Sequence, residues 1–165
     1  MATHALAPIT TNESRNELIQ LVSFKLDSEE YGIEVLKVRE IIRMIPITHM
    51  PNSPSYVEGI INLRGKIIPV VSMRRKFGLM DQENSTQTRI VVMDISGELM
   101  GFIVDSVSEV IRISSSEIQP PPNVVSGGFD QECITGVFNQ ADRLLVLLDL
   151  EQLFSHEEKS FLMSV

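Results

Sequence analysis

The chain has 165 residues, about the length of one globular domain, and its 14 basic and 22 acidic residues give a formal net charge of −8. This acidic balance argues against nucleic acid as a partner, because binding to phosphates needs a cationic surface. The content of 43% hydrophobic and 22% charged residues is typical of a chain that buries a core. The single cysteine, Cys133, excludes an intramolecular disulfide and a metal site built from several cysteines.

Residues 1–16 are small, polar and without periodicity, and we interpret them as a flexible N-terminal tail. They lack the cationic and apolar regions of a secretory signal. The richest apolar stretch, Leu144–Leu148, is five residues long, whereas a membrane-spanning helix needs roughly 20. We therefore expect a cytoplasmic protein without direct membrane insertion.

Alternation of apolar and polar residues predicts strands in the first half of the chain. It begins near Leu18, where Val22, Phe24 and Leu26 alternate with polar residues. The other elements expected here are a strand at 31–35, a β-branched stretch at 38–50, a hairpin of strands 59–63 and 66–71, and a short helix at 72–77.

The second half repeats this style of sequence after a polar loop at 81–88. Its Pro- and Gly-rich stretch at 119–131 is typical of an irregular loop. The elements expected around these loops are strands at 89–95 and 99–105, a hairpin within 132–149, and a C-terminal helix at 150–162.

An internal duplication explains the similarity of the two halves. Shifted by 69 positions, Tyr31–Met44 falls on Met100–Ile113 with six of 14 residues identical. Shifted by 77, Gly59–Val71 falls on Gly136–Leu148 with matching apolar positions. Two β units of about 65 residues each are too short for sandwiches and predict small barrels packed side by side. Residues 17–80 carry a net charge of +2 and residues 81–165 one of −10.

Motifs of enzyme active sites are missing from the sequence. It contains no nucleophile elbow, no phosphate-binding glycine loop and no paired-histidine zinc motif. Cys133 begins an apolar stretch, where a small buried side chain is the ordinary interpretation. A thiol enzyme that uses Cys133 stays as a remote alternative, and we expect no metal and no cofactor.

The hairpin around Arg64 is the most informative local feature. Gly65 supplies the positive φ that a tight turn needs, so the turn does not require Arg64. A guanidinium at a turn offers a rigid fork of donors suited to a carboxylate on another molecule. A solvated turn arginine is the simpler alternative. The nearby basic run Arg74-Arg75-Lys76 is typical of the outer face of a helix.

At these residues the sequence resembles the CheW family of bacterial chemotaxis coupling proteins. The matching stretches are Glu30–Ile41, Gly59–Val70 and Lys76–Gly78, with weaker matches at Gly101–Val110 and Ile134–Val137. The resemblance spans residues 17–155. It implies two five-stranded SH3-like β-barrels with a groove between them, in an all-β chain with a short C-terminal helix. We expect the first barrel at about 17–80 and the second at about 89–149, and the two barrels could exchange strands. A C-terminal helix and tail should follow at 150–165.

The resemblance also implies a non-enzymatic adaptor. Such an adaptor links the cytoplasmic tips of methyl-accepting chemoreceptors to the regulatory domain of the histidine kinase CheA. An adaptor of another CheA-type pathway, such as twitching motility, is the alternative. Carried over residue by residue, the resemblance implies receptor binding by Arg64, Glu40 and Gly101, and kinase binding by Val38, Ile47 and Gly59. Core packing remains an alternative for Val38 and Ile47, and backbone geometry remains one for the two glycines.

Overall fold

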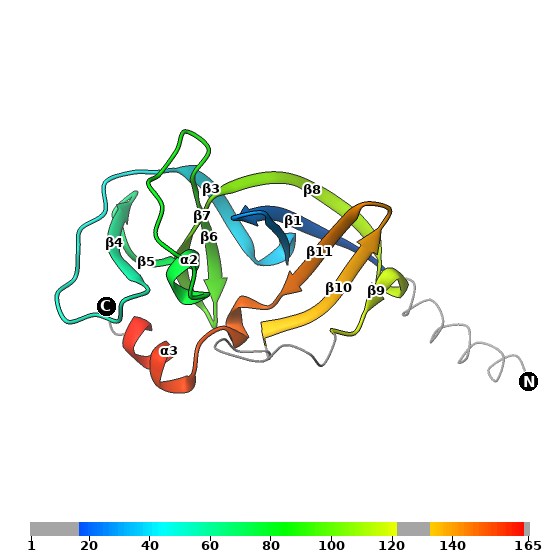
Figure 1. Ribbon diagram of the computed structural model, residues 1–165. Helices are drawn as coiled ribbons and strands as arrows, with labels where there is room; N and C mark the ends of the chain where they lie inside the picture. The colour runs from blue at the N-terminus through cyan, green and yellow to red at the C-terminus, as the bar shows by residue number, and fades with distance from the viewer. Residues whose placement is uncertain (1–16, 122–132, 164–165) are drawn as a thin grey trace, which may run out of the picture.

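The computed structural model describes residues 17–121 and 133–163, so the expected N-terminal tail and most of the 119–131 loop lie outside the described residues. The described chain is mostly β, and it has the short C-terminal helix that was predicted (Figure 1). Its strands are β1 (Leu18–Leu26), β2 (Glu29–Glu34), β3 (Val38–Arg43), β4 (Val57–Leu63), β5 (Lys66–Ser72), β6 (Arg89–Ile95), β7 (Glu98–Val104), β8 (Ser106–Ser114), β9 (Ile118–Gln119), β10 (Ile134–Gln140) and β11 (Arg143–Leu148). The helices are α2 (Met73–Lys76) and α3 (His156–Met163), and 3-10 turns occupy η1 (Val35–Lys37), η2 (Ser115–Glu117) and η4 (Leu150–Gln152).

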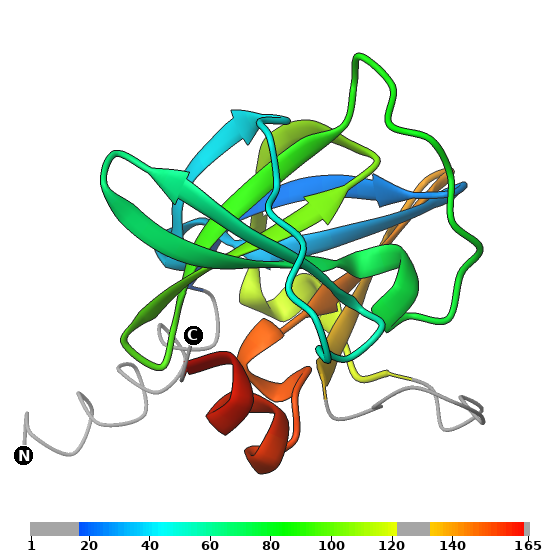
Figure 2. The ribbon, with the colours of Figure 1, turned by 90° about the vertical axis from the view of Figure 1, so that its left-hand side faces the viewer.

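The strands form two sheets, each of which closes into a small barrel. The five-stranded barrel has the order β3-β6-β7-β5-β4, and the six-stranded barrel has the order β8-β1-β2-β11-β10-β9. In the five-stranded barrel, an isolated bridge between Thr48 and Ile60 joins the segment after β3 to β4. In the six-stranded barrel, β9 follows β8 along the chain, and its Gln119 pairs with Val137 of β10. This pairing closes the six-stranded barrel as the Thr48–Ile60 bridge closes the five-stranded one. Figure 2 shows the five-stranded barrel from its own side, with α3 below it.

The boundaries of the barrels differ from the sequence-based ranges of 17–80 and 89–149. The five-stranded barrel is the continuous segment 38–104, whereas β1 and β2 join β8–β11 in the six-stranded barrel. The halves therefore exchange strands reciprocally, because β3 pairs with β6 while β8 pairs with β1. Turn η1 carries the chain from β2 in the six-stranded barrel to β3 in the five-stranded barrel. Its Val35 packs against the core between the barrels. Alternation along one strand does not specify its partner, which is why the sequence misplaced this boundary.

The structure confirms the duplication. When β1–β5 are matched to β6, β7, β8, β10 and β11, the barrels have the same strand order, apart from the extra β9. The turn residues match as well. Asp27 and Ser96, 69 positions apart, both have left-handed backbones with φ of 55° and 53°. Arg64 and Ala141, 77 positions apart, have φ of 52° and 51°.

The largest apolar core lies between the barrels, not inside either of them. It draws on equivalent residues of the two repeats, such as Val22 with Val91 and Ile33 with Phe102. Two smaller clusters fill the barrel interiors, and these are also equivalent, with Leu21 and Ile90 as one example. Much of the expected groove is therefore filled by side chains. Residues 38–104 hold eight basic and six acidic residues, so the five-stranded barrel keeps the +2 charge.

The single helix expected at 150–162 is divided in two. Ser155 interrupts it and caps α3, because its hydroxyl accepts from the amide of Glu158 at 3.1 Å while its own amide donates to the Glu158 carboxylate at 2.9 Å. Lys76 of the five-stranded barrel donates to the same carboxylate at 2.8 Å. Phe154 packs against Phe102 in the core between the barrels. The C-terminal segment thus leaves the six-stranded barrel and docks on the other.

This docking is expected to weaken in acid. Burial of the Glu158 carboxylate opposes ionisation, but the hydrogen bonds from Lys76 and from the Ser155 amide outweigh burial and lower the pKa of Glu158 from 4.5 to about 2. Because the pKa in the folded state is the lower one, the stabilisation is present above about pH 4.5 and is lost as the pH falls towards 2. The difference in unfolding free energy between the native chain and Glu158→Gln should therefore shrink over this range. Glu157→Gln, at an exposed position of the same helix, is the control. A difference that stays constant with pH would contradict the assignment.

Candidate functional site

Arg64 lies at the tip of the β4–β5 hairpin in a left-handed backbone conformation. Its φ is 52° and that of Gly65 is 87°, so both central residues of the turn have positive φ. The side-chain oxygen of Asn62 accepts from the Gly65 amide at 2.9 Å and fixes the turn. The expectation that Gly65 alone meets the backbone requirement is therefore wrong. A non-glycine residue in this conformation is uncommon, and asparagine or glycine would adopt it at less cost.

The guanidinium of Arg64 pairs with the carboxylate of Glu40 on β3. The structure thus brings together two of the three predicted receptor-binding residues, from segments that are 24 positions apart. The Arg64 side chain remains 71% exposed, so its remaining donors face solvent. A surface ion pair of this kind adds little stability, about 1 kcal/mol at most. Its more evident effect is to orient an accessible cation.

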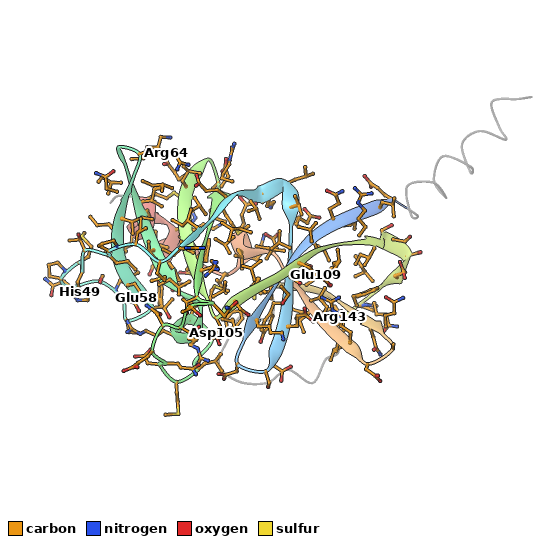
Figure 3. All side chains as sticks on the ribbon, turned by 90° about the horizontal axis from the view of Figure 1, so that it is seen from above. His49, Glu58, Arg64, Asp105, Glu109 and Arg143 are labelled. Atoms are coloured by element: carbon orange, nitrogen blue, oxygen red, sulfur yellow. The ribbon has the colours of Figure 1, made fainter. Side chains whose placement is uncertain are left out.

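The equivalent place on the six-stranded barrel is built differently. Glu109 corresponds to Glu40 in the duplication, and it pairs with Arg143 at 2.6 Å. Arg143 also forms two hydrogen bonds to Glu30, at 2.9 and 2.7 Å. These hydrogen bonds outweigh burial and lower the pKa of Glu30. The hairpin tip itself carries Ala141, and Figure 3 shows Arg143 and Glu109 on the opposite barrel from Arg64. Arg143 therefore has a structural role, whereas the Arg64 fork is presented outward.

Gly101, the third predicted receptor residue, lies apart from this pair. It is buried in β7, between Val70 of β5 and Val92 of β6. A Cβ atom added to it would lie 2.8 Å from the Ile90 side chain, inside the barrel core. Close packing of the backbone accounts for glycine at this position, which agrees with the alternative from backbone geometry.

The predicted kinase residues occupy two places. Ile47 and Gly59 meet where the segment after β3 crosses β4, and a Cβ atom on Gly59 would lie 2.9 Å from Ile47 and 2.1 Å from the carbonyl oxygen of Thr48. Ile47 is half-buried against the core of the five-stranded barrel. Val38, at the start of β3, packs instead against the core between the barrels. All six predicted site residues therefore lie within the five-stranded barrel.

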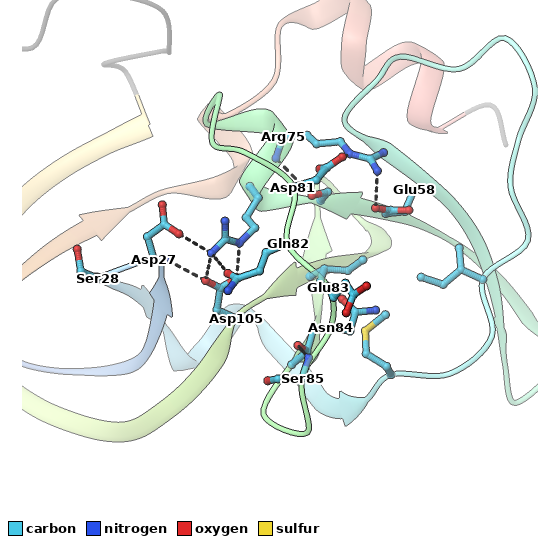
Figure 4. A pocket seen from close by; sticks show the side chains of 16 residues that line it. Asp27, Ser28, Glu58, Arg75, Asp81, Gln82, Glu83, Asn84, Ser85 and Asp105 are labelled. Atoms are coloured by element: carbon cyan, nitrogen blue, oxygen red, sulfur yellow. Dashed lines mark hydrogen bonds and ion pairs between the residues drawn. The ribbon is translucent and has the colours of Figure 1, made fainter.

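The sequence did not reveal a polar groove of about 990 Å³ next to Ile47 (Figure 4). One wall carries Asp27 and Asp105, which lie side by side in the close-up. Arg74 lies between these two carboxylates and is only 11% exposed. The expectation that residues 74–76 form the outer face of a helix is therefore wrong for Arg74, and also for Lys76, whose side chain is 13% exposed and pairs with Glu158. Spacing within one helical turn could not show which carboxylates approach these side chains from distant segments.

Cys133 is the residue on which the remote alternative of a thiol enzyme depends. Cys133 is completely buried in the core between the barrels, where a substrate cannot reach its thiol. Among residues 17–121 and 133–163, no group of three or more His, Cys, Asp or Glu side chains could hold a metal ion. The described helices are also too short or too polar to span a membrane.

Comparison with known proteins gives a consistent result. A family model described as "CheW-like domain" matches residues 20–158. The chemotaxis protein CheW of Treponema pallidum is 35% identical and aligns over 94% of this chain and 91% of its own length. The Helicobacter pylori protein of the same name is 36% identical over 88% and 87%. The crystal structure of the scaffolding protein TtCheW from Thermoanaerobacter tengcongensis superposes with a TM-score of 0.78 at 37% identity, covering 86% of this chain and 96% of that one.

Proposed function

The chain belongs to the CheW-like domain family, and from this premise we propose that it couples chemoreceptor tips to the regulatory domain of a CheA-type histidine kinase. As a member of this family it is a chemotaxis scaffold protein. The partners are our proposal, as is its location in the cytoplasm at receptor assemblies. The work of such a scaffold is binding, and we propose that it catalyses no reaction.

The exposed Arg64 fork is the observation that carries the receptor side of the proposal. The duplication supplies an internal comparison, because the same hairpin on the other barrel carries Ala141 and has its nearby arginine committed to Glu30 and Glu109. A cation that the fold does not need, held in one orientation by Glu40, suits a carboxylate on a partner. Arginine is also enriched among the residues that dominate binding energy at interfaces.

The kinase side of the proposal rests on Ile47. Its side chain is half-buried, so it offers apolar surface next to the 990 Å³ groove without leaving the barrel core. Interfaces of ordinary size bury about 800 Å² on each partner, and a few well-packed residues near their centre carry most of the binding energy. Val38 and Gly59 contribute to this proposal indirectly, because Gly59 fixes the backbone under Ile47 and Val38 anchors β3.

Two substitutions separate the proposed surfaces. Arg64→Asn removes the cation while keeping a residue that tolerates the left-handed turn, and we expect it to weaken binding to a receptor tip fragment by about tenfold or more while kinase binding is unchanged. Ile47→Asp should weaken binding to the kinase regulatory domain and leave binding to the receptor tip fragment unchanged. Binding of each variant to each partner by calorimetry gives the four measurements.

Lys66→Gln is the matched control, because Lys66 is an exposed cation on the same hairpin. Equal losses of receptor binding in Lys66→Gln and Arg64→Asn would show a general charge effect and refute a specific role for Arg64. Circular dichroism and thermal melting of Ile47→Asp are needed alongside. An unfolded variant would assign Ile47 to the core and leave the kinase surface without its anchor.

A further inference from the structure

Arg74 joins the two barrels through a network that we call the Arg74 clamp: Arg74, Asp27 and Asp105. Arg74 follows β5 of the five-stranded barrel, and its guanidinium donates to Asp105 at 2.8 and 2.7 Å. It also pairs with Asp27 in the β1–β2 turn of the six-stranded barrel. The Asp27 amide donates to the Asp105 carboxylate at 2.8 Å and closes the network. Burial opposes ionisation of Asp105, but the hydrogen bonds from Arg74 and Asp27 prevail and lower its pKa.

A second network, the Glu151 clamp, joins the barrels through Glu151, Ser96 and Lys37. Glu151 follows β11 of the six-stranded barrel, and its carboxylate accepts from the amide of Ser96 at 2.8 Å. Ser96 lies in the β6–β7 turn of the five-stranded barrel. Lys37, in the turn that crosses from one barrel to the other, donates to the same carboxylate at 2.7 Å. The hydrogen bonds from Lys37 and Ser96 lower the pKa of Glu151.

The two clamps occupy equivalent positions in the duplication. Glu151 lies 77 positions after Arg74, and Ser96 lies 69 positions after Asp27, which are the same shifts that relate the two repeats. Asp27 and Ser96 also share the left-handed turn conformation. In each case, a residue two or three positions after the last strand of a repeat holds the first hairpin turn of the same repeat, and strand exchange places that turn in the other barrel. The chemistry is reversed, however, because one clamp is centred on a cation and the other on an anion.

We propose that Arg74 and Glu151 are positioning residues that set the orientation of the two barrels in the scaffold. The core between the barrels is apolar, and apolar contact is less directional than hydrogen bonding, so the core constrains the angle between the two sheets less sharply than paired polar groups do. Charge-assisted hydrogen bonds are directional, and the guanidinium fork meets carboxylates from two separate segments. The orientation determines where the six-stranded barrel stands relative to partners bound on the five-stranded barrel. This consequence rests on the proposed function, whereas the orientation itself does not.

The test measures the distance between the barrels in the full chain without any partner. Nitroxide labels are placed on cysteines at Lys66 and Gln140, which are exposed positions on the two hairpins, in a Cys133→Ala background. Double electron–electron resonance should give a single narrow distance distribution. We expect Arg74→Gln and Glu151→Gln each to shift or broaden it. Arg75→Gln should leave it unchanged, because Arg75 pairs with Glu58 and Asp81 and neither residue belongs to the six-stranded barrel.

An unchanged distribution in both clamp variants overturns the proposal, even if their melting temperatures fall, because the clamps would then only add stability. Equal broadening in Arg75→Gln also overturns it. If Arg74→Gln does not fold, Asp27→Ala removes one carboxylate partner of Arg74 at the protein surface and decides the question in the same way. No receptor or kinase is present, so failure here is distinct from failure of the partner assignments.

Discussion

Replacement of Gly59 with alanine is expected to destabilise the protein by roughly 3–5 kcal/mol, because two costs add at this position. The backbone has a φ of +150°, which side chains rarely allow, and the new Cβ atom would lie 2.1 Å from the carbonyl oxygen of Thr48. That carbonyl accepts from the Ile60 amide at 2.9 Å in the bridge that closes the five-stranded barrel. The clash therefore opens the closure of the barrel. Urea denaturation measures the loss.

Gly65→Ala is the matched control for this prediction. Its φ is +87°, yet nothing lies within 4 Å of an added Cβ atom, so only the conformational cost of about 1 kcal/mol is expected. A Gly59→Ala protein of native stability that no longer binds the kinase would contradict the structural explanation. Gly59 would then be a contact residue, as the family resemblance by itself suggests.

Truncation of Phe102 to alanine is expected to cost roughly 3–5 kcal/mol and to leave a single unfolding transition. Phe102 belongs to β7, is fully buried in the core between the barrels, and stacks on Phe154 of the C-terminal segment with ring centroids 6.1 Å apart. Loss of the ring therefore weakens both barrels and the docking of α3 together. Thermal unfolding followed by circular dichroism and by calorimetry would report this as one cooperative event.

Phe161→Ala provides the control, because Phe161 of α3 lies at the surface and its truncation should cost less than about 1 kcal/mol. Two separate transitions in Phe102→Ala would contradict the structural interpretation. They would mean that each barrel is stable by its own interior cluster and that the shared core contributes little.

The candidate site illustrates what sequence patterns can and cannot provide. The hairpin around Arg64 could be identified from the sequence, because a tight turn leaves a local signature. The match of this hairpin to the family was also visible, because it depends on residues that are neighbours along the chain. The pairing of Arg64 with Glu40 was not, since β3 and the β4–β5 hairpin meet only when the barrel closes. The same reason explains why Arg74 was misjudged, because its carboxylate partners come from positions 27 and 105.

Gly59 and Gly101 show the complementary limit. A family resemblance marks both positions, but it cannot say whether a glycine is needed for a partner or for the backbone. The distances from their absent Cβ atoms to Thr48 and Ile90 supply a backbone reason in each case. Contact with a partner then becomes an additional hypothesis that binding measurements must support.

The sequence by itself determined the all-β class, the duplication, the positions of most strands and the family, because alternation and repeat spacing are written along the chain. Only the tertiary structure decided which strands share a barrel. The reciprocal pairing of β3 with β6 and of β8 with β1 places equivalent apolar residues of both repeats in one shared core. Strand alternation records which side chains are buried but not against which neighbour, so barrel membership, the shared core and the two clamps depend on contacts between segments far apart in the sequence.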